Sequence, residues 1–259
     1  MAKIVMHASV VVSVSVVSHG QMDLITQLMQ DIEGHCRGTA IELLVTLNTP
    51  ENFQHEASRF SYPVTVIRNT VPKGFGANHN QAFQHATGDY FCVMNPDIRL
   101  HNNPFDVLQS LLQDATIGVA APVVLGPSGA VEDSARIFPT LSKIIGKMFT
   151  KNWSSDYVWG QSPVDVDWVA GMLMMFSRPV FERMQGFDER HFLYYEDVNL
   201  CARLHLAGLR VVVCPSCQVV HHAQRHSHRH LKYFRWHVAS LFRYLCSAEY
   251  CQLQHLHRL

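Results

Sequence analysis

The sequence lacks both a charge imbalance and a long apolar run. Lysine plus arginine and aspartate plus glutamate each number 21, so the formal charge at pH 7 is 0. Without a basic excess there is no broad footprint for nucleic acid, and we expect no nucleic-acid partner. The longest apolar stretch, 10–17, is interrupted by Ser13 and Ser15 and is well short of the roughly 20 residues that a membrane helix needs. We therefore expect no membrane-spanning segment.

The first residues also lack the basic, apolar and small-residue regions of a secretory signal peptide. The seven cysteines are odd in number and scattered, which is typical of free thiols in a reducing compartment. Only Cys214 and Cys217 have the C-x-x-C spacing, and because no second pair completes a zinc site, a metal or redox role is the less favoured interpretation. These absences predict a cytoplasmic protein.

The composition itself is that of a globular protein. With 259 residues, 47% of them hydrophobic and 16% charged, the chain fits one α/β domain with an appended C-terminal element. Its first half alternates predicted strands with predicted helices, which favours an open, mostly parallel sheet flanked by helices. The strands are 10–17, 41–47, 64–67 and 90–94, and the helices are 23–32, the residues behind a glycine-rich turn at 73–76 as far as about 86, and 104–112 behind an N-cap at Asn103.

The second half is less regular. Residues 119–124 and 131–137 flank Gly126-Pro127-Ser128-Gly129 and predict a hairpin, and an apolar run at 168–176, a helix near Glu196 and strands at 210–213 and 219–220 follow. At the C-terminus, 230–246 carries apolar residues at helical spacing together with three basic residues. That segment is either an amphipathic helix docked on the domain or a helix that rests at an anionic membrane surface.

Candidate binding residues follow two of the predicted strands. Ligands of open α/β sheets bind outside the carboxyl ends of the strands, where the glycine-rich turn and Asn95-Pro96-Asp97 both lie. The turn and the helix start behind it would favour a diphosphate, although a plain capped turn fits equally well. The turn does not match the G-x-G-x-x-G motif of nicotinamide-binding domains, because His79 occupies the position of the third glycine. Asp97 suits a divalent cation that bridges phosphate oxygens, or a turn.

Further candidates stand beside apolar segments. Glu196 and Asp197 follow the aromatic run 192–195, where a buried carboxylate is costly unless it is used or partnered. As exposed acids they would only complement a helix dipole. Of the histidines at 221–230, the one directly after the buried strand, His221 or its neighbour His222, is the best candidate for a metal ligand, and the rest are expected at the surface.

Taken together, the motifs form an ordered set. They are Gly74-Phe-Gly-x-x-x-Asn80, Asn95-Pro-Asp97, the segment 129–139, Asp167-Trp-Val-Ala-Gly171, the segment 186–197 that ends in the acid pair, and the strand that ends at His221. In this order the chain resembles family 2 glycosyltransferases of the rhamnosyltransferase type over about residues 8–247. The resemblance implies a GT-A fold, which is a Rossmann-like open mixed sheet flanked by helices. It also implies an inverting transfer from a nucleotide-activated sugar with a divalent metal, Mg²⁺ or Mn²⁺.

The resemblance assigns roles residue by residue. Asp197 matches the catalytic base, with Glu196 beside it, and Asp97 matches the last acid of the family's metal-binding motif. His221 matches the histidine that closes the metal and diphosphate site. Donor binding is implied for Lys73, Gly74, Phe75, Gly76, Asn80, Asn95 and Asp97, and acceptor binding is implied for Trp168 and Gly171.

Two positions depart from the family pattern. Where the family has an Asp-Asn pair after the second strand, this chain reads Thr46-Leu47-Asn48-Thr49, which leaves recognition of the nucleotide base open. The family's E-D-x-D appears here as Glu196-Asp197-Val198-Asn199. One carboxylate is therefore missing, and Asp197 is favoured as the base.

Domain organisation and substrate are expectations from the same resemblance. Residues 1–228 would form the glycosyltransferase domain, with a nucleotide-sugar half to about 100 and an acceptor half over about 101–228, and 229–259 a C-terminal helix and tail. The expected reaction moves rhamnose from dTDP-rhamnose to a hydroxyl of a surface polysaccharide or lipid-linked glycan, with peripheral contact to the inner face of the cell membrane. The alternatives are a non-catalytic nucleotide-sugar or glycan-binding module and, less favoured, a nicotinamide-dependent oxidoreductase.

Overall fold

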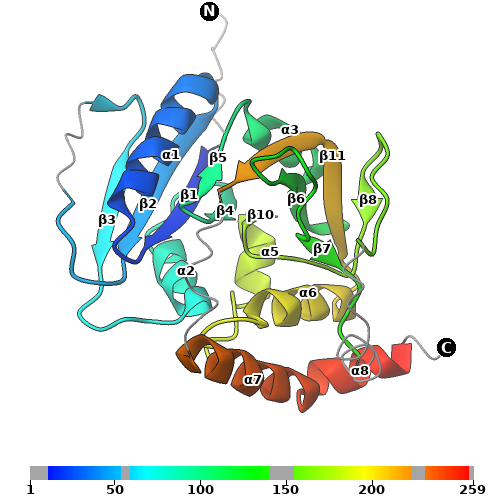
Figure 1. Cartoon of the computed structure of the whole chain (residues 1–259). Coiled ribbons are helices and arrows are strands. Elements are labelled where there is room, and N and C mark those ends of the chain that lie inside the picture. The colour runs from blue at the N-terminus through cyan, green and yellow to red at the C-terminus, as the bar shows by residue number, and fades with distance from the viewer. Residues whose placement is uncertain (1–10, 54–58, 141–154, 223–230, 257–259) are drawn as a thin grey trace, which may run out of the picture.

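The computed structural model describes residues 11–53, 59–140, 155–222 and 231–256 (Figure 1). In this part of the chain a nine-stranded sheet has the order β3-β2-β1-β4-β10-β6-β11-β5, with β8 paired to β11, and a second sheet pairs β7 with β9. The strands are β1 (Val11–Ser18), β2 (Ala40–Leu47), β3 (Val64–Arg68), β4 (Tyr90–Met94), β5 (Ile98–Arg99), β6 (Ile117–Leu125), β7 (Ala135–Arg136), β8 (Val164–Asp165), β9 (Trp168–Val169), β10 (Leu173–Ser177) and β11 (Arg210–His221). The helices are α1 (Met22–His35), α2 (Phe75–Phe83), α3 (Pro104–Leu111), α5 (Arg178–Arg183), α6 (Glu196–Leu206), α7 (Leu231–Leu245) and α8 (Ala248–Leu256).

The strand directions collect the ends of several strands at one edge of the sheet. β2 and β4 pair with β1 in parallel, and β3 extends β2 in parallel. β10 runs antiparallel between β4 and β6, and β11 is again parallel to β6. The carboxyl ends of β1 to β4, β6 and β11 therefore share an edge, which is where ligands of such sheets bind. The mixed open sheet flanked by helices confirms the fold class predicted from the sequence.

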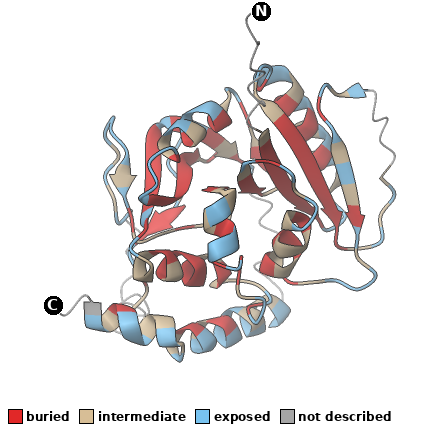
Figure 2. Ribbon diagram, turned by 180° about the vertical axis from the view of Figure 1, so that it is seen from behind, coloured by how far each residue is buried: buried red, intermediate tan, exposed pale blue. Residues whose placement is uncertain are grey.

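The central strands of the sheet lie between two separate cores, and Figure 2 shows these strands buried along most of their length. Val12, Val14 and Val16 of β1 belong to the core that includes α1 and α3. Phe91 and Phe176 belong to the opposite core, which includes residues of α5, α6, α7 and α8. A strand covered on both sides is apolar at nearly every position, which explains the β-branched run at 10–17.

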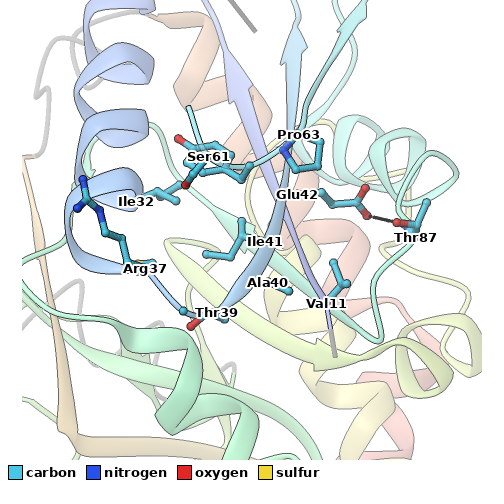
Figure 3. A pocket seen from close by; sticks show the side chains of 13 residues that line it. Val11, Ile32, Arg37, Thr39, Ala40, Ile41, Glu42, Ser61, Pro63 and Thr87 are labelled. Atoms are coloured by element: carbon cyan, nitrogen blue, oxygen red, sulfur yellow. Dashed lines mark hydrogen bonds between the residues drawn. The ribbon is translucent and has the colours of Figure 1, made fainter. Parts of the chain in front are cut away.

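The serines of β1 are paired polar groups within this apolar strand. Ser15 Oγ lies 2.8 Å from Nδ1 of His79 in α2. Burial lowers the pKa of His79 to about 3, so its ring is neutral and contributes to the core. Ser13 donates to Glu42, which also accepts from Thr87 and borders a cavity of about 340 Å³ at the amino ends of β1 and β2 (Figure 3). This cavity lies at the edge of the sheet opposite to the predicted site residues.

The predicted hairpin at 119–137 is wrong in its second half. The chain does turn back after β6, but the returning segment makes a single bridge, between Leu125 and Val131. Residues of β7 pair instead with β9 in the separate two-stranded sheet. The physical reason is that β10 and β11 already occupy the two edges of β6, so a returning strand has no edge to join. The apolar run 168–176 likewise divides into β9 and β10, with a turn at Gly171 and Met172 between them.

The C-terminal element consists of α7 and α8, which lie end to end beneath α6 (Figure 1). The predicted domain boundary at 228/229 and the histidines at 226, 228 and 230 lie outside the described residues.

Cys214 and Cys217 are buried free thiols of β11, and Cys217 Sγ contacts the carbonyl oxygen of Pro104 at 3.8 Å. Among the described residues, no helix has the length and apolar character needed to cross a bilayer.

Candidate active site

Three asparagine side chains form hydrogen bonds at the carboxyl ends of β2 and β3. Asn48 follows β2, accepts from the Lys73 amide at 2.8 Å and donates to the Lys73 carbonyl at 2.9 Å. Asn69 follows β3 and donates to the side-chain oxygens of both Asn48 and Asn78. Lys73 Nζ then donates to Gln81 at 2.7 Å. Asn48, which the sequence analysis noted only as a departure from the family pattern, thus fixes the turn that precedes α2.

The turn before α2 approaches the segment 187–192 so closely that its glycine positions have no space for a side chain. A Cβ at Gly74 would lie 2.5 Å from the carbonyl oxygen of Phe192, and one at Gly76 would lie 2.5 Å from Cβ of Phe187. Between them, the Phe75 amide donates to the Phe192 carbonyl at 2.9 Å. The first amide of α2 is therefore bonded within the protein, and the two glycines are required for the close approach.

Asn80 extends the same contact. Its Nδ2 donates to the Phe187 carbonyl at 2.9 Å and to Glu189 at 3.0 Å, and its Oδ1 accepts from the Phe187 amide at 2.9 Å. The predicted donor-binding residues of this region each have a partner or close neighbour in the protein. Their role in binding the donor stays a prediction, and their observed role is to join α2 to the loop before α6.

Asp197 is held at the start of α6 by an unusual backbone. Tyr194 and Tyr195 both adopt left-handed φ angles, 71° and 67°, directly before the helix. Such angles cost non-glycine residues about 1 kcal/mol or more and are common at functional sites. Asp197 Oδ2 accepts from the Gly171 amide at 3.1 Å, and Oδ1 accepts from the Val198 amide at 2.8 Å. Asp197 as a residue is half-buried, and its carboxylate is fixed in orientation by these two amides.

Glu196 and Asp197 differ in environment. Burial raises the pKa of Asp197, although the amides of Val198 and Gly171 lower it in part. Glu196 is only 4% exposed, and no described residue hydrogen-bonds its buried Oε2. Burial, and second the charge of Asp197, raise the pKa of Glu196 well above the usual range. This contrast favours a protonated, neutral Glu196 and leaves Asp197 as the carboxylate of the pair.

The predicted metal residues meet at the ends of β4 and β11. Nε2 of His221 lies 3.2 Å from Oδ2 of Asp97, and Nδ1 lies 2.6 Å from Oε2 of Glu132. Burial by itself would lower the pKa of His221, but hydrogen bonds and charges from Asp97 and Glu132 outweigh it and raise that pKa to about 9. Glu132 was not predicted as a site residue, although it lies in the quoted segment 129–139.

The residues around Asp97 fit a divalent cation. Oδ1 of Asp97 is buried, and no described residue donates a hydrogen bond to it. An unpaired buried carboxylate oxygen is costly, and a hard cation would satisfy it. In the described ranges no three His, Cys, Asp or Glu side chains gather as a complete metal site, so a bound cation would take further ligands from outside this set. Asn95, half-buried, is joined to Met172 through its backbone amide at 2.9 Å.

Of the two predicted acceptor residues, Gly171 lies next to Asp197. Gly171 provides the amide that holds this carboxylate, and a Cβ at Gly171 would lie 2.7 Å from the ring of Phe75. Trp168 is half-buried, and its Nε1 donates to the Ile137 carbonyl at 3.2 Å. Gly171 therefore brings Asp197 and the start of α2 together, while contact of Trp168 with an acceptor stays a prediction.

A family model described as glycosyltransferase like family 2 matches residues 46–239, a range that includes Asp97, Asp197 and His221. The chain belongs to this family. The glycosyltransferase is 30% identical over 254 residues to the rhamnosyltransferase WbbL of Escherichia coli (strain K12), which covers 90% of this chain and 92% of that protein. It is 31% identical over 168 residues to an N-acetylglucosaminyl-diphospho-decaprenol L-rhamnosyltransferase of Mycobacterium tuberculosis, with 61% of this chain and 54% of that protein covered.

Solved structures show the fold of the glycosyltransferase. GalNAc-T7 with UDP, GalNAc and Mn²⁺ matches with a TM-score of 0.63 at 15% identity, over 84% of this chain and 44% of that one. S. aureus TarS 1-349 in complex with UDP matches with a TM-score of 0.60 at 14% identity, over 92% and 66% of the two chains. Membership of the family identifies the protein as an enzyme of sugar transfer. This activity takes the place of the nicotinamide-dependent oxidoreductase considered as an alternative.

The raised pKa of Glu196 has a consequence for stability. Because the folded state holds this proton more tightly than the unfolded state, the free energy of unfolding falls as pH rises from the ordinary glutamate pKa toward the raised one. Glu196→Gln keeps the shape without an ionisable group. We expect the variant to lose less stability than the wild type between pH 5 and 9, with its Tm raised by about 2–4 °C for each kcal/mol recovered. Thermal unfolding followed by circular dichroism measures this.

Glu182→Gln is the matched control for that measurement, because Glu182 has a side chain that is 55% exposed and that pairs with Arg178 on its own helix. Its Tm should follow the wild type at every pH. A Glu196→Gln protein with the same pH dependence as the wild type would show that Glu196 does not carry a raised pKa.

Proposed function

We propose that this glycosyltransferase moves rhamnose from dTDP-rhamnose to a hydroxyl of a surface polysaccharide or lipid-linked glycan, with inversion at the anomeric carbon. The main observation behind the proposal is the position of Asp197. Its carboxylate accepts hydrogen bonds from two backbone amides, and the neighbouring Glu196 is buried. The names of the relatives support rhamnose as the sugar. One of those names also contains a lipid diphosphate, which supports the lipid-linked class of acceptor.

In the proposed reaction, Asp197 carries out one proton transfer. Its carboxylate accepts the proton of the acceptor hydroxyl while the hydroxyl oxygen attacks the anomeric carbon and the bond from that carbon to the diphosphate breaks. The amide of Gly171 keeps one carboxylate oxygen fixed during this step. Asp97 and His221 would hold a divalent cation, which supplies positive charge to the departing diphosphate.

The first test compares wild type with Asp197→Asn. Purified proteins are incubated with dTDP-, UDP- and GDP-sugars, Mg²⁺ or Mn²⁺, and a lipid-diphosphate-linked acceptor sugar, and nucleoside diphosphate release is measured. We expect the wild type to use dTDP-rhamnose and the variant to be slower by about 10²–10⁴-fold with nearly unchanged donor affinity, because an amide keeps the shape but cannot accept the proton. Near wild-type turnover by the variant would exclude Asp197 as the base. Donor binding without turnover by the wild type would favour a non-catalytic binding module.

The second test concerns the cation. Asp97→Ala should weaken Mn²⁺-dependent donor binding in calorimetric titrations, because the variant lacks the anionic oxygen ligand for the cation that would balance the diphosphate charge. EDTA should abolish turnover of the wild type, and added Mn²⁺ should restore it. Asp165→Ala, which removes an exposed carboxylate paired with Arg210, is the control and should bind donor like the wild type. Full activity in chelator would leave Asp97 as a turn residue.

The helix α7 supports peripheral contact with the membrane. One side of the helix packs on the domain through Trp236, which stacks on Phe192 with ring centroids 4.5 Å apart, and through the buried Tyr244. The other side exposes large apolar residues at helical spacing. They are Leu231 (77% exposed), Phe234 (66%), Val238 (45%) and Phe242 (69%). A helix that only docks on its domain needs no second apolar face.

The charge of α7 supports an anionic lipid surface as the occupant of that face. Residues 231–245 include Lys232, Arg235 and Arg243 and no acidic residue. Basic residues near such a surface contribute about 1 kcal/mol each, and exposed aromatic residues such as Phe234 and Phe242 suit the interface. This contact would place the enzyme at the inner face of the cell membrane, where a lipid-linked acceptor is presented.

Flotation with liposomes tests this attachment. The wild type should float with phosphatidylglycerol-containing liposomes at low salt and bind several-fold less at high salt or on neutral liposomes. Phe234→Ser/Phe242→Ser should lose most of the binding, while the control Val71→Ser/Val158→Ser, which removes exposed apolar residues elsewhere, should keep it. A wild type that stays in the soluble fraction at both salt concentrations would leave α7 as a docked helix alone.

A further inference from the structure

Three segments that are distant in sequence meet at His221. β5 places Ile98 beside His221, so that Asp97 is next to the ring, and β6 places Leu125 beside Val220. Glu132 follows the turn after β6, where its backbone amide donates to the Val124 carbonyl at 2.8 Å. The imidazole consequently lies between two carboxylates, with Nδ1 at 2.6 Å from Glu132 and Nε2 at 3.2 Å from Asp97.

We propose that Glu132 is a positioning residue, which accepts the Nδ1 hydrogen of His221 and thereby keeps Nε2 turned toward Asp97 and the cation of the donor complex. The inference rests on the metal-dependent donor binding proposed above. A histidine that ligates a metal commonly donates its other ring N–H to a carboxylate, which fixes its tautomer and orientation. Nε2 of His221 and the unpaired Oδ1 of Asp97 then serve as two donors for one cation.

The surroundings of Glu132 suit this role. A Cβ at Gly126 would lie 3.3 Å from Oε1 of Glu132, so the carboxylate lies close against the turn after β6. The neighbouring Asp133 is no substitute, because it pairs with Arg136. The side chain of Glu132 is 24% exposed and that of His221 is 11% exposed, so the contact lies at the rim of the site and the ring lies deeper.

The experiment measures Mn²⁺ binding directly, by the electron paramagnetic resonance signal of free Mn²⁺ in the presence of dTDP and without any transfer. Glu132→Ala should raise the apparent Kd for Mn²⁺ by about 10–100-fold, the range seen when such outer partners are removed. Glu132→Gln should restore most of the affinity, because its side-chain oxygen can still accept the Nδ1 hydrogen. Glu182→Ala, which removes an exposed carboxylate of α5, should bind like the wild type. Circular dichroism and Tm show whether each variant is folded.

Each result decides between accounts. A folded Glu132→Ala protein with the Mn²⁺ affinity of the wild type would overturn the positioning role and leave metal-dependent donor binding intact. If Glu132→Gln bound Mn²⁺ as weakly as Glu132→Ala, the negative charge of Glu132, and not the orientation of the His221 ring, would determine the Mn²⁺ affinity. That result would also overturn the proposal. A wild type that binds no Mn²⁺ with dTDP would overturn the metal site of the proposed function, and the role of Glu132 with it.

Discussion

The close contact between the glycine-rich turn of α2 and the segment 187–195 is the constraint on which the active site depends. It exists because Gly74 and Gly76 carry no side chain: a Cβ at either position would lie 2.5 Å from an atom of the other segment. The segment so held ends in the two left-handed tyrosines that direct Glu196 and Asp197 into the first turn of α6. On the far side, α7 braces the same segment, since Ser240 donates to the Leu193 carbonyl at 2.9 Å. The position of Asp197 thus follows from the packing of α2 and α7 against the segment 187–195.

The electrostatics of the site divide its acids into distinct roles. Glu196 is buried and its Oε2 has no hydrogen-bond partner among the described residues, which favours its neutral form, whereas Asp197 keeps two amide donors that stabilise a carboxylate. Asp97 and Glu132 instead share His221, whose raised pKa reports the negative charge gathered there. A region with surplus negative charge and an unpaired carboxylate oxygen is suited to a cation, and a diphosphate would bring the remaining negative charge to that cation.

Much of this arrangement could be predicted from the sequence, because it follows from local patterns. The β-branched run of β1, the cap of α3 by Asn103 and the acids at the start of α6 depend on neighbours in the chain, and the structure has all three. The rest depends on pairing between distant segments. The second half of the predicted hairpin failed because both edges of β6 were taken, and Glu132 was missed because nothing in 129–139 shows that β11 ends beside it. Asn69 and Asn78 gave no signal, since their hydrogen bonds exist only once β3 and α2 are in place.

In the proposed mechanism Asp197 activates the acceptor hydroxyl for one direct displacement at the anomeric carbon. The most direct measurement is the anomeric configuration of the product, read from the one-bond carbon–hydrogen coupling constant of the new glycosidic linkage by NMR and compared with that of the donor sugar. A single displacement assisted by one base predicts a product of opposite anomeric configuration to the donor. A product that retains the donor's configuration would contradict the account, because it would require a mechanism other than one direct attack by the acceptor.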